Sequence, residues 1–283
     1  MSSTPGSDTQ AFARLVDALD PFLDQLVFIG GWGHRLMALH PSAIPPRHEL
    51  LMTEDVDIAT PERLSSKAGS ILGRLEEAGF SEELSSEFEP PISQYTLPGS
   101  GSGLYAEFLA PLLGAETRRD GTPNATVSIA GVSAQKLRHL DLLFEGPWSV
   151  TISRKNGFHN LDKPTILRIP NPISFVVQKL LVMPKRARRQ DRAKDVLYTY
   201  DTLALFVGAT DALLASWRLL SPRIDKRSKS KLTLQIDKLF RVPSDDVREA
   251  AEVARATGRA NPPTANQIAA ACRGRLLEIL PET

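Results

Sequence analysis

Two aspartates separated by one residue, Asp55 and Asp57, are the residues whose types and spacing best suit catalysis in this sequence. Alternate residues of a β-strand project from the same face, so both carboxylates would lie together while Val56 and Ile58 enter the core. Two nearby carboxylates repel each other unless a cation or a shared proton lies between them, and hard oxygen ligands suit Mg²⁺. The spacing therefore predicts a divalent-cation site on a strand.

A glycine pair, Gly30 and Gly31, lies upstream between an apolar segment at 27–29 and an amphipathic stretch at 33–39. A strand that ends in a tight turn before the start of a helix presents backbone N–H groups to a ligand, and such groups hold phosphate. Together with the two aspartates, the glycine pair favours a nucleotidyl-transfer site.

A third acid, Glu107, is the one charge in an apolar strand-like run. A buried carboxylate without a partner is costly, so we expect it to have one. Two Mg²⁺ ions shared with Asp55 and Asp57 would supply that partner, one activating an attacking hydroxyl and the other bridging a triphosphate. An ion pair with Arg138 or Arg168 would explain Glu107 equally well.

A lysine, Lys179, interrupts the apolar face of a helix expected at 172–183, which Asn171 would cap. Its aliphatic stem can lie along the core while its ammonium group reaches an anion, either a triphosphate or a carboxylate. Asp195 and Asp201 are both candidates to pair with it, and Asp195 is preferred. The alternative is a lysine that simply extends to the surface.

Basic residues gather at 185–194 and again at 223–231. The first run contains Arg186, Arg188 and Arg189, which would form a rim for an RNA acceptor. A solvated loop explains the same run, because no aromatic residue is interleaved to stack on bases.

The glycine pair, the Asp-x-Asp strand and the later strand acid together resemble the signature of the DNA polymerase β-like nucleotidyltransferase superfamily. The interval between Gly31 and Asp55 is longer than is common there, and Gly31 stands where many members have serine. Within that superfamily the chain is most similar to bacterial nucleotidyltransferase toxins of the AbiEii and MenT type and their relatives. That likeness includes a Pro-x-x-Phe helix with its lysine, at 169–179, and a Lys-Asp pair at 194–195.

This resemblance implies an Mg²⁺-dependent enzyme that moves NMP from an NTP to a hydroxyl acceptor. The acceptor would be RNA, such as a tRNA end, and an antitoxin protein would be a partner. A small-molecule nucleotidyltransferase of the aminoglycoside type and a module that binds nucleotide without turnover are the alternatives. The implied catalytic and metal-binding residues are Asp55, Asp57 and Glu107, and the implied nucleotide-binding residues are Gly30, Gly31, Lys179 and Asp195.

The apolar periodicity predicts an α/β (α+β) fold, with a small mixed-sheet core followed by a helical C-terminal domain. We expect an N-terminal helical segment at 1–25, a core domain at 26–170 and a helical domain at 171–283. Strands are expected at 27–29, 55–59, 92–97, 104–109, 126–129, 148–153 and 166–169. Helices are expected at 8–25, 32–40, 65–79, 133–140, 172–183, 190–206, 211–219, 229–240, 244–257 and 264–280.

Composition narrows the classes of protein to consider. The 283 residues are 42% hydrophobic with a formal net charge of +1, which suits a folded chain with a substantial core. A single cysteine, Cys272, excludes an internal disulfide and a cysteine-based zinc cage. No signal pattern occurs at 1–10 and no apolar window is long enough to span a membrane, so we expect a cytoplasmic protein.

Other chemistries find little support. The five histidines show no metal-ligand spacing, and no Gly-x-Ser-x-Gly motif occurs. The glycine-serine run at 99–103 lacks the lysine of a phosphate-binding loop and predicts a hairpin turn. We expect Trp32, which follows the glycine pair, to pack in the core rather than to stack on a base.

Overall fold

The computed structural model describes residues 7–46, 48–51, 53–65, 69–85 and 92–281. Contacts group the chain into two compact units. The first unit contains Met1–Leu39 and Met52–Ile169, and the second contains His40–Leu51 and Pro170–Thr283. The segment at 40–51, which interrupts the first unit in sequence, thus belongs to the second.

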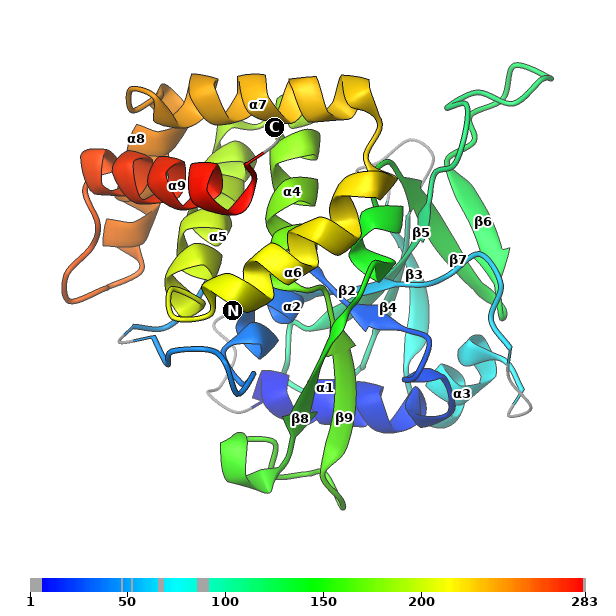
Figure 1. The fold of residues 1–283 in the computed structure, drawn as a ribbon. Helices are drawn as coiled ribbons and strands as arrows, with labels where there is room; N and C mark the ends of the chain where they lie inside the picture. The colour runs from blue at the N-terminus through cyan, green and yellow to red at the C-terminus, as the bar shows by residue number, and fades with distance from the viewer. Residues whose placement is uncertain (1–6, 47, 52, 66–68, 86–91, 282–283) are drawn as a thin grey trace. The chain divides into compact units, whose positions relative to one another are not determined.

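The first unit is built on a mixed seven-stranded sheet (Figure 1). Strand β5 (Tyr105–Pro111) pairs in parallel with β2 (Asp55–Ala59) and with β7 (Val132–Leu137), and the other pairings of the sheet are antiparallel. The remaining strands are β1 (Val27–Phe28), β3 (Ser81–Ser85), β4 (Ile92–Thr96) and β6 (Thr126–Ile129). The helices are α1 (Ser7–Ala18), α2 (Gly30–Met37) and α3 (Ile71–Glu77), with short 3₁₀ turns at Asp20–Phe22, Asp141–Phe144 and Arg154–Asn156.

The alternation expected for the aspartate strand is present in β2. Val56 and Ile58 are fully buried, whereas Asp55 and Asp57 are half-buried on the opposite face. This is the pattern of a strand with one face in the core and the other open to a ligand or solvent. The predicted strand that carries the two acids is therefore confirmed. Met52, which precedes this strand in the sequence, lies outside the described residues.

Several sequence predictions for the first unit are wrong in detail. The helix expected at 133–140 is instead strand β7, because pairing with β5 and β6 overrides the weak helical propensity of this segment. Residues 126–169 do not all join the main sheet, since β8 (Trp148–Ile152) and β9 (Thr165–Ile169) form a separate two-stranded sheet. Strand β3 was not expected at all. The helix expected at 65–79 is shorter, with Ser70 as its N-cap, and residues 66–68 lie outside the described part.

The second unit is helical after Pro170 (Figure 1). Helix α5 packs against α4 and α8, and α4 also packs against α6 and α7. The predicted α+β class is therefore confirmed. The helices are α4 (Pro172–Val182), α5 (Arg189–Leu205), α6 (Thr210–Leu220), α7 (Lys226–Phe240), α8 (Asp245–Ala256) and α9 (Ala265–Ile279), with 3₁₀ turns at Met183–Lys185 and Ser221–Arg223.

The interrupting segment at 40–51 is held within the second unit by polar contacts to α5. The Ile44 N–H donates to the carbonyl of Leu205 at 2.7 Å, and His48 Nε2 lies 3.5 Å from Asp201 Oδ1. These contacts fix the long connection that the sequence places between the glycine turn and the aspartate strand. Across the described residues, no helix is both long enough and apolar enough to cross a membrane.

The start of α4 is fixed by the cap that the sequence predicts. Asn171 is fully buried, and its Oδ1 accepts hydrogen bonds from the N–H groups of Ile173 at 3.0 Å and Ser174 at 2.9 Å. Pro172 occupies the first turn, where a missing N–H costs nothing. These contacts set the phase of the helix that carries Lys179.

We predict that Asn171→Ala lowers the free energy of unfolding by about 1 kcal/mol or somewhat more, because two N–H groups lose their acceptor in a buried place. Urea unfolding measures this change. Asn171→Asp, which keeps an oxygen acceptor at the same position, is the control and should lose less stability. Equal stability of the alanine variant and the wild type would contradict the capping role.

Candidate active site

The two aspartates and the glutamate lie on the same face of the sheet in the first unit. In the parallel pairing of β2 with β5, Asp57 stands opposite Glu107 and Asp55 stands opposite Tyr105. Ala106 and Phe108, the neighbours of Glu107 on β5, are buried on the other face. The structure thus brings together the three acids that the sequence singled out.

The partner of Glu107 is a neutral side chain. Gln94 Nε2 on β4 donates a hydrogen bond of 2.8 Å to Glu107 Oε1. The predicted alternatives are wrong, because Arg138 pairs with Glu116 at 2.6 Å and Arg168 donates to the carbonyl of Asp24. Sequence reasoning missed Gln94, which only the register of β4 against β5 places beside the glutamate.

Negative charge is concentrated at this face. Burial raises the pKa of Glu107 above its ordinary value, the hydrogen bond from Gln94 opposes that change, and the charge of Asp55 adds to it. Burial also raises the pKa of the Tyr105 hydroxyl, and the charges of Asp55, Glu107 and Asp57 raise it further. A positively charged ligand would relieve this repulsion.

The glycine turn packs directly against these acids. Gly30, which begins α2, has φ of +61°, and a Cβ there would collide with the carboxylate of Asp57. A Cβ on Gly31 would collide with the side chain of Thr53. The Ile29 N–H donates to the Asp57 carbonyl at 2.9 Å, which ties the turn to β2. Glycine is thus required here both by backbone conformation and by the close approach of Asp57.

The Trp32 side chain packs in the core next to the glycine turn. It is 2% exposed, its ring stacks on Phe12 with centroids 4.1 Å apart, and its Nε1 donates to the Thr53 carbonyl at 3.2 Å. The prediction that Trp32 packs in the core is confirmed.

The donor set at this face suits a divalent cation by its chemistry. Asp55, Asp57 and Glu107 offer carboxylate oxygens, the ligands that Mg²⁺ prefers. Within the described ranges, no group of three or more histidine, cysteine, aspartate or glutamate side chains is already arranged to hold a metal ion. The role of the three acids as metal ligands therefore stays a prediction.

The second unit contains the other predicted site residues. Lys179 Nζ lies 3.1 Å from Asp195 Oδ1 and also lies over the rings of Phe175 and Tyr198, 5.4 Å and 5.2 Å from their centroids. Lys179 is only 8% exposed, so the alternative of a lysine that extends to the surface is wrong.

The choice between the two candidate aspartates is decided by a second ion pair. Asp201 accepts hydrogen bonds from Arg259 Nη1 and Nη2 at 2.8 Å and 2.6 Å, and both side chains are buried. Asp195 is therefore the residue that pairs with Lys179, and Asp201 serves a different cation. No local pattern indicates Arg259 as the partner, because it lies 58 positions away from Asp201.

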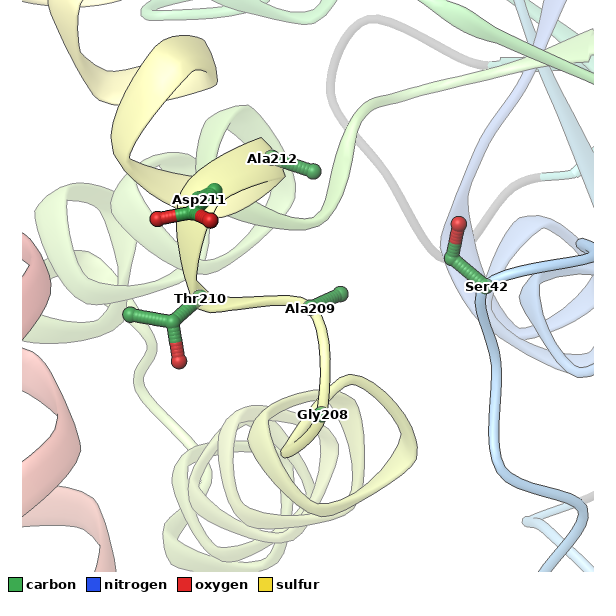
Figure 2. Close-up of a pocket in the computed structure, with 6 residues that line it drawn as sticks. All are labelled: Ser42, Gly208, Ala209, Thr210, Asp211 and Ala212. Atoms are coloured by element: carbon green, nitrogen blue, oxygen red, sulfur yellow. The ribbon is translucent and has the colours of Figure 1, made fainter.

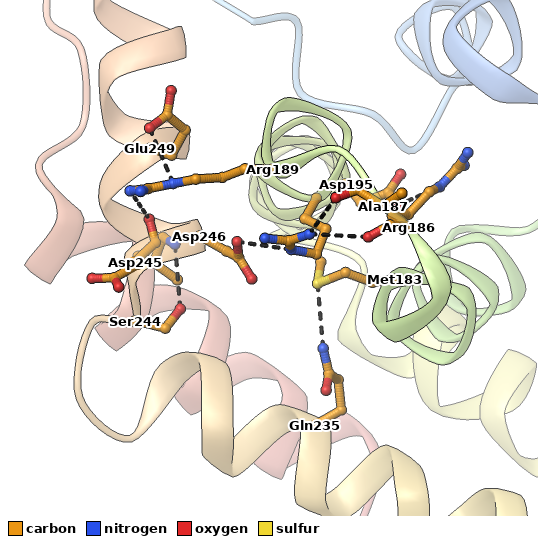
Figure 3. A network of polar contacts seen from close by, with 12 residues as sticks. Met183, Arg186, Ala187, Arg189, Asp195, Gln235, Ser244, Asp245, Asp246 and Glu249 are labelled. Atoms are coloured by element: carbon orange, nitrogen blue, oxygen red, sulfur yellow. Dashed lines mark hydrogen bonds and ion pairs between the residues drawn. The ribbon is translucent and has the colours of Figure 1, made fainter.

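Several arginines of the basic run form ion pairs with acidic residues of the same unit (Figure 3). Arg186 pairs with Asp195 at 3.3 Å, Arg189 with Glu249 at 3.3 Å, and Arg192 with Asp246 at 3.0 Å. These pairs reduce the positive charge that the run offers to an RNA backbone. The role of Arg186, Arg188 and Arg189 in binding RNA stays a prediction.

A separate hollow of about 450 Å³ lies in the second unit (Figure 2). It is lined by Ser42 and by residues 208–212 at the start of α6. None of the predicted site residues lines it, so it plays no part in the site described above.

Comparison with known proteins gives one family. A family model described as nucleotidyltransferase matches residues 7–218, which include all the predicted site residues. No curated protein matches the chain.

We predict that Gly30→Ala destabilises the protein by about 1–3 kcal/mol, because the new Cβ meets Asp57 and the backbone has a positive φ. Chemical denaturation measures the change. Gly274→Ala in α9 is the matched control, since a Cβ there meets nothing within 4 Å, and it should stabilise the protein slightly. A neutral Gly30→Ala variant would contradict the tight packing of the turn on Asp57.

We also predict a pH-dependent effect of Glu107→Gln in the presence of a chelator. The pKa of Glu107 lies above its ordinary value of 4.5 only in the folded state, so the folded state holds this proton more tightly. Wild-type stability should therefore fall, relative to the variant, as the pH rises from about 4.5 through the folded-state pKa. Unfolding curves recorded at several pH values test this, and parallel pH dependence of the two proteins would contradict it.

Proposed function

We propose, from the premise that this chain belongs to the nucleotidyltransferase family, that it moves NMP from an NTP to a hydroxyl acceptor in an Mg²⁺-dependent reaction. The observation that carries this proposal is the placement of Asp57 opposite Glu107, with Asp55 on the same face and the glycine turn against Asp57. This arrangement provides carboxylates for a cation and backbone N–H groups for phosphate in one place.

The reaction can be written with the residues of the site. The acceptor oxygen forms a bond to the α-phosphorus, the bond from that phosphorus to the α–β bridging oxygen breaks, and pyrophosphate leaves. The carboxylate of Glu107 takes the proton of the acceptor hydroxyl, a role that its raised pKa favours. Bound Mg²⁺, held by Asp55 and Asp57 with Glu107, would neutralise the phosphate oxygens and polarise the acceptor hydroxyl.

The backbone N–H groups of the glycine turn and the ammonium group of Lys179 are the proposed contacts for the nucleotide. The N–H groups at the start of α2, at Gly30 and Gly31, would hold phosphate oxygens, and Lys179 would neutralise the phosphate chain. Asp195 would hold the Lys179 ammonium group in place, as the distance of 3.1 Å between them supports.

The acceptor that the resemblance favours is RNA, in the manner of a toxin controlled by an antitoxin. The ion pairs of Arg189 with Glu249 and of Arg192 with Asp246 favour a second candidate, a small-molecule hydroxyl acceptor, because they leave less free positive charge for an RNA backbone. The two candidates share the same chemistry at the acids.

The proposal is tested by incubating the protein with labelled NTPs, Mg²⁺, and either total RNA or a panel of small hydroxyl compounds. We expect label to move to an acceptor, and we expect Asp57→Asn to lower the rate by about 10²–10³-fold because a charge that stabilises the transition state is lost. Glu54→Gln, which removes a charge close to the same strand, is the control and should keep the activity.

The outcomes separate the candidates. Transfer to RNA supports the toxin-like enzyme, and transfer to a small molecule supports the second candidate. Nucleotide binding without transfer to any acceptor would contradict the enzyme and favour a module that only binds nucleotide. Full activity of the Asp57→Asn variant would contradict the role of the acids.

A further inference from the structure

We propose that Arg186 is a further phosphate-binding residue and that, together with Lys179, it forms a two-cation site for the phosphate chain of the nucleotide. The proposal rests on the proposed function for the identity of its ligand and adds a residue to it. It starts from a contact within the second unit, where the buried carboxylate of Asp195 binds both cations.

The charges of this cluster do not balance. Asp195, which is 2% exposed, accepts Lys179 on Oδ1 at 3.1 Å and Arg186 on Oδ2 at 3.3 Å. One carboxylate thus faces two cations, which leaves a net charge of about +1 in a place with limited solvent. An anion such as a phosphate group would complete this balance.

The ion pair with Asp195 orients the guanidinium group of Arg186 and engages only part of its hydrogen-bonding capacity. Only its Nε donates to Asp195, and its Nη1 and Nη2 groups have no hydrogen-bond partner within the described residues. The side chain is 44% exposed, so these groups are open to a ligand. Two parallel N–H groups on a rigid plane match two oxygens of a phosphate, which a lysine cannot do.

The backbone around Arg186 is held in one conformation. Its N–H donates to the Met183 carbonyl at 2.9 Å. Arg192 Nη1 donates to the carbonyls of Arg186 at 3.0 Å and Ala187 at 3.2 Å, while its Nε donates to Asp246 at 3.0 Å. Arg192 therefore connects this turn to α8, and these contacts hold the backbone at Arg186 in place without a ligand.

The neighbouring arginines differ from Arg186 in what they contact. Figure 3 shows Arg189 beside α8, where it pairs with the Glu249 carboxylate and donates to the backbone carbonyl of Asp245, whereas Arg186 lies beside Asp195. Arg189 is thus already neutralised by a surface acid. Arg218 on α6, an exposed arginine of the same unit with no assigned binding role, offers a matched comparison.

The test is calorimetric titration of the full-length protein with inorganic tripolyphosphate and with Mg²⁺-ATP, each without an acceptor. We expect Arg186→Gln to weaken binding of both ligands about tenfold, the loss typical of a charge-assisted hydrogen-bonded pair. Arg218→Gln removes the same charge and should bind within about twofold of the wild type. Arg186→Lys should recover only part of the affinity, because the second N–H group is missing.

Several results would overturn the assignment. These are unchanged affinity of the Arg186→Gln variant, equal weakening by Arg218→Gln, or absence of tripolyphosphate binding by the wild type. Thermal unfolding of each variant checks that the fold is kept. Because the titration contains no acceptor, a protein that binds tripolyphosphate through Arg186 but transfers no NMP would contradict the proposed function and leave this assignment standing.

Discussion

The parallel pairing of β2 with β5 imposes one electrostatic constraint on the first unit. It places Asp57 opposite Glu107 and keeps Asp55 on the same face, so three carboxylates share a half-buried surface. Repulsion and desolvation both disfavour that arrangement, and a neutral hydrogen bond from Gln94 to Glu107 partly offsets them. The chain can fold with this surface in place, and a bound cation would lower the repulsion among the three carboxylates.

The second unit shows the opposite imbalance. Asp195 is one buried carboxylate that pairs with two cations, Lys179 and Arg186, and the proposed phosphate group would balance the remaining positive charge. Within the second unit this cluster suits an anion, and within the first unit the three acids suit a cation.

Other charges in the second unit serve the fold. The buried pair of Asp201 with Arg259 is joined by two parallel N–H groups, so each ion has an opposite charge beside it. His48 brings the segment at 40–51 to the same aspartate, and the arginines of the basic run connect α5 to α8. The charge-rich stretches of this chain thus include ion pairs that hold its segments together, and composition alone does not identify those pairs.

The sequence by itself determined the features that depend on local chemistry. Alternation of apolar residues located β2, helical periodicity located α4 to α9, Asn171 marked the start of α4, and the isolated charge of Glu107 marked a buried acid. The tertiary structure decided the partners: Gln94 for Glu107, Asp195 rather than Asp201 for Lys179, and strand rather than helix for residues 132–137. Periodicity and capping act over a few residues, whereas strand register and ion-pair choice depend on which distant segments pack together.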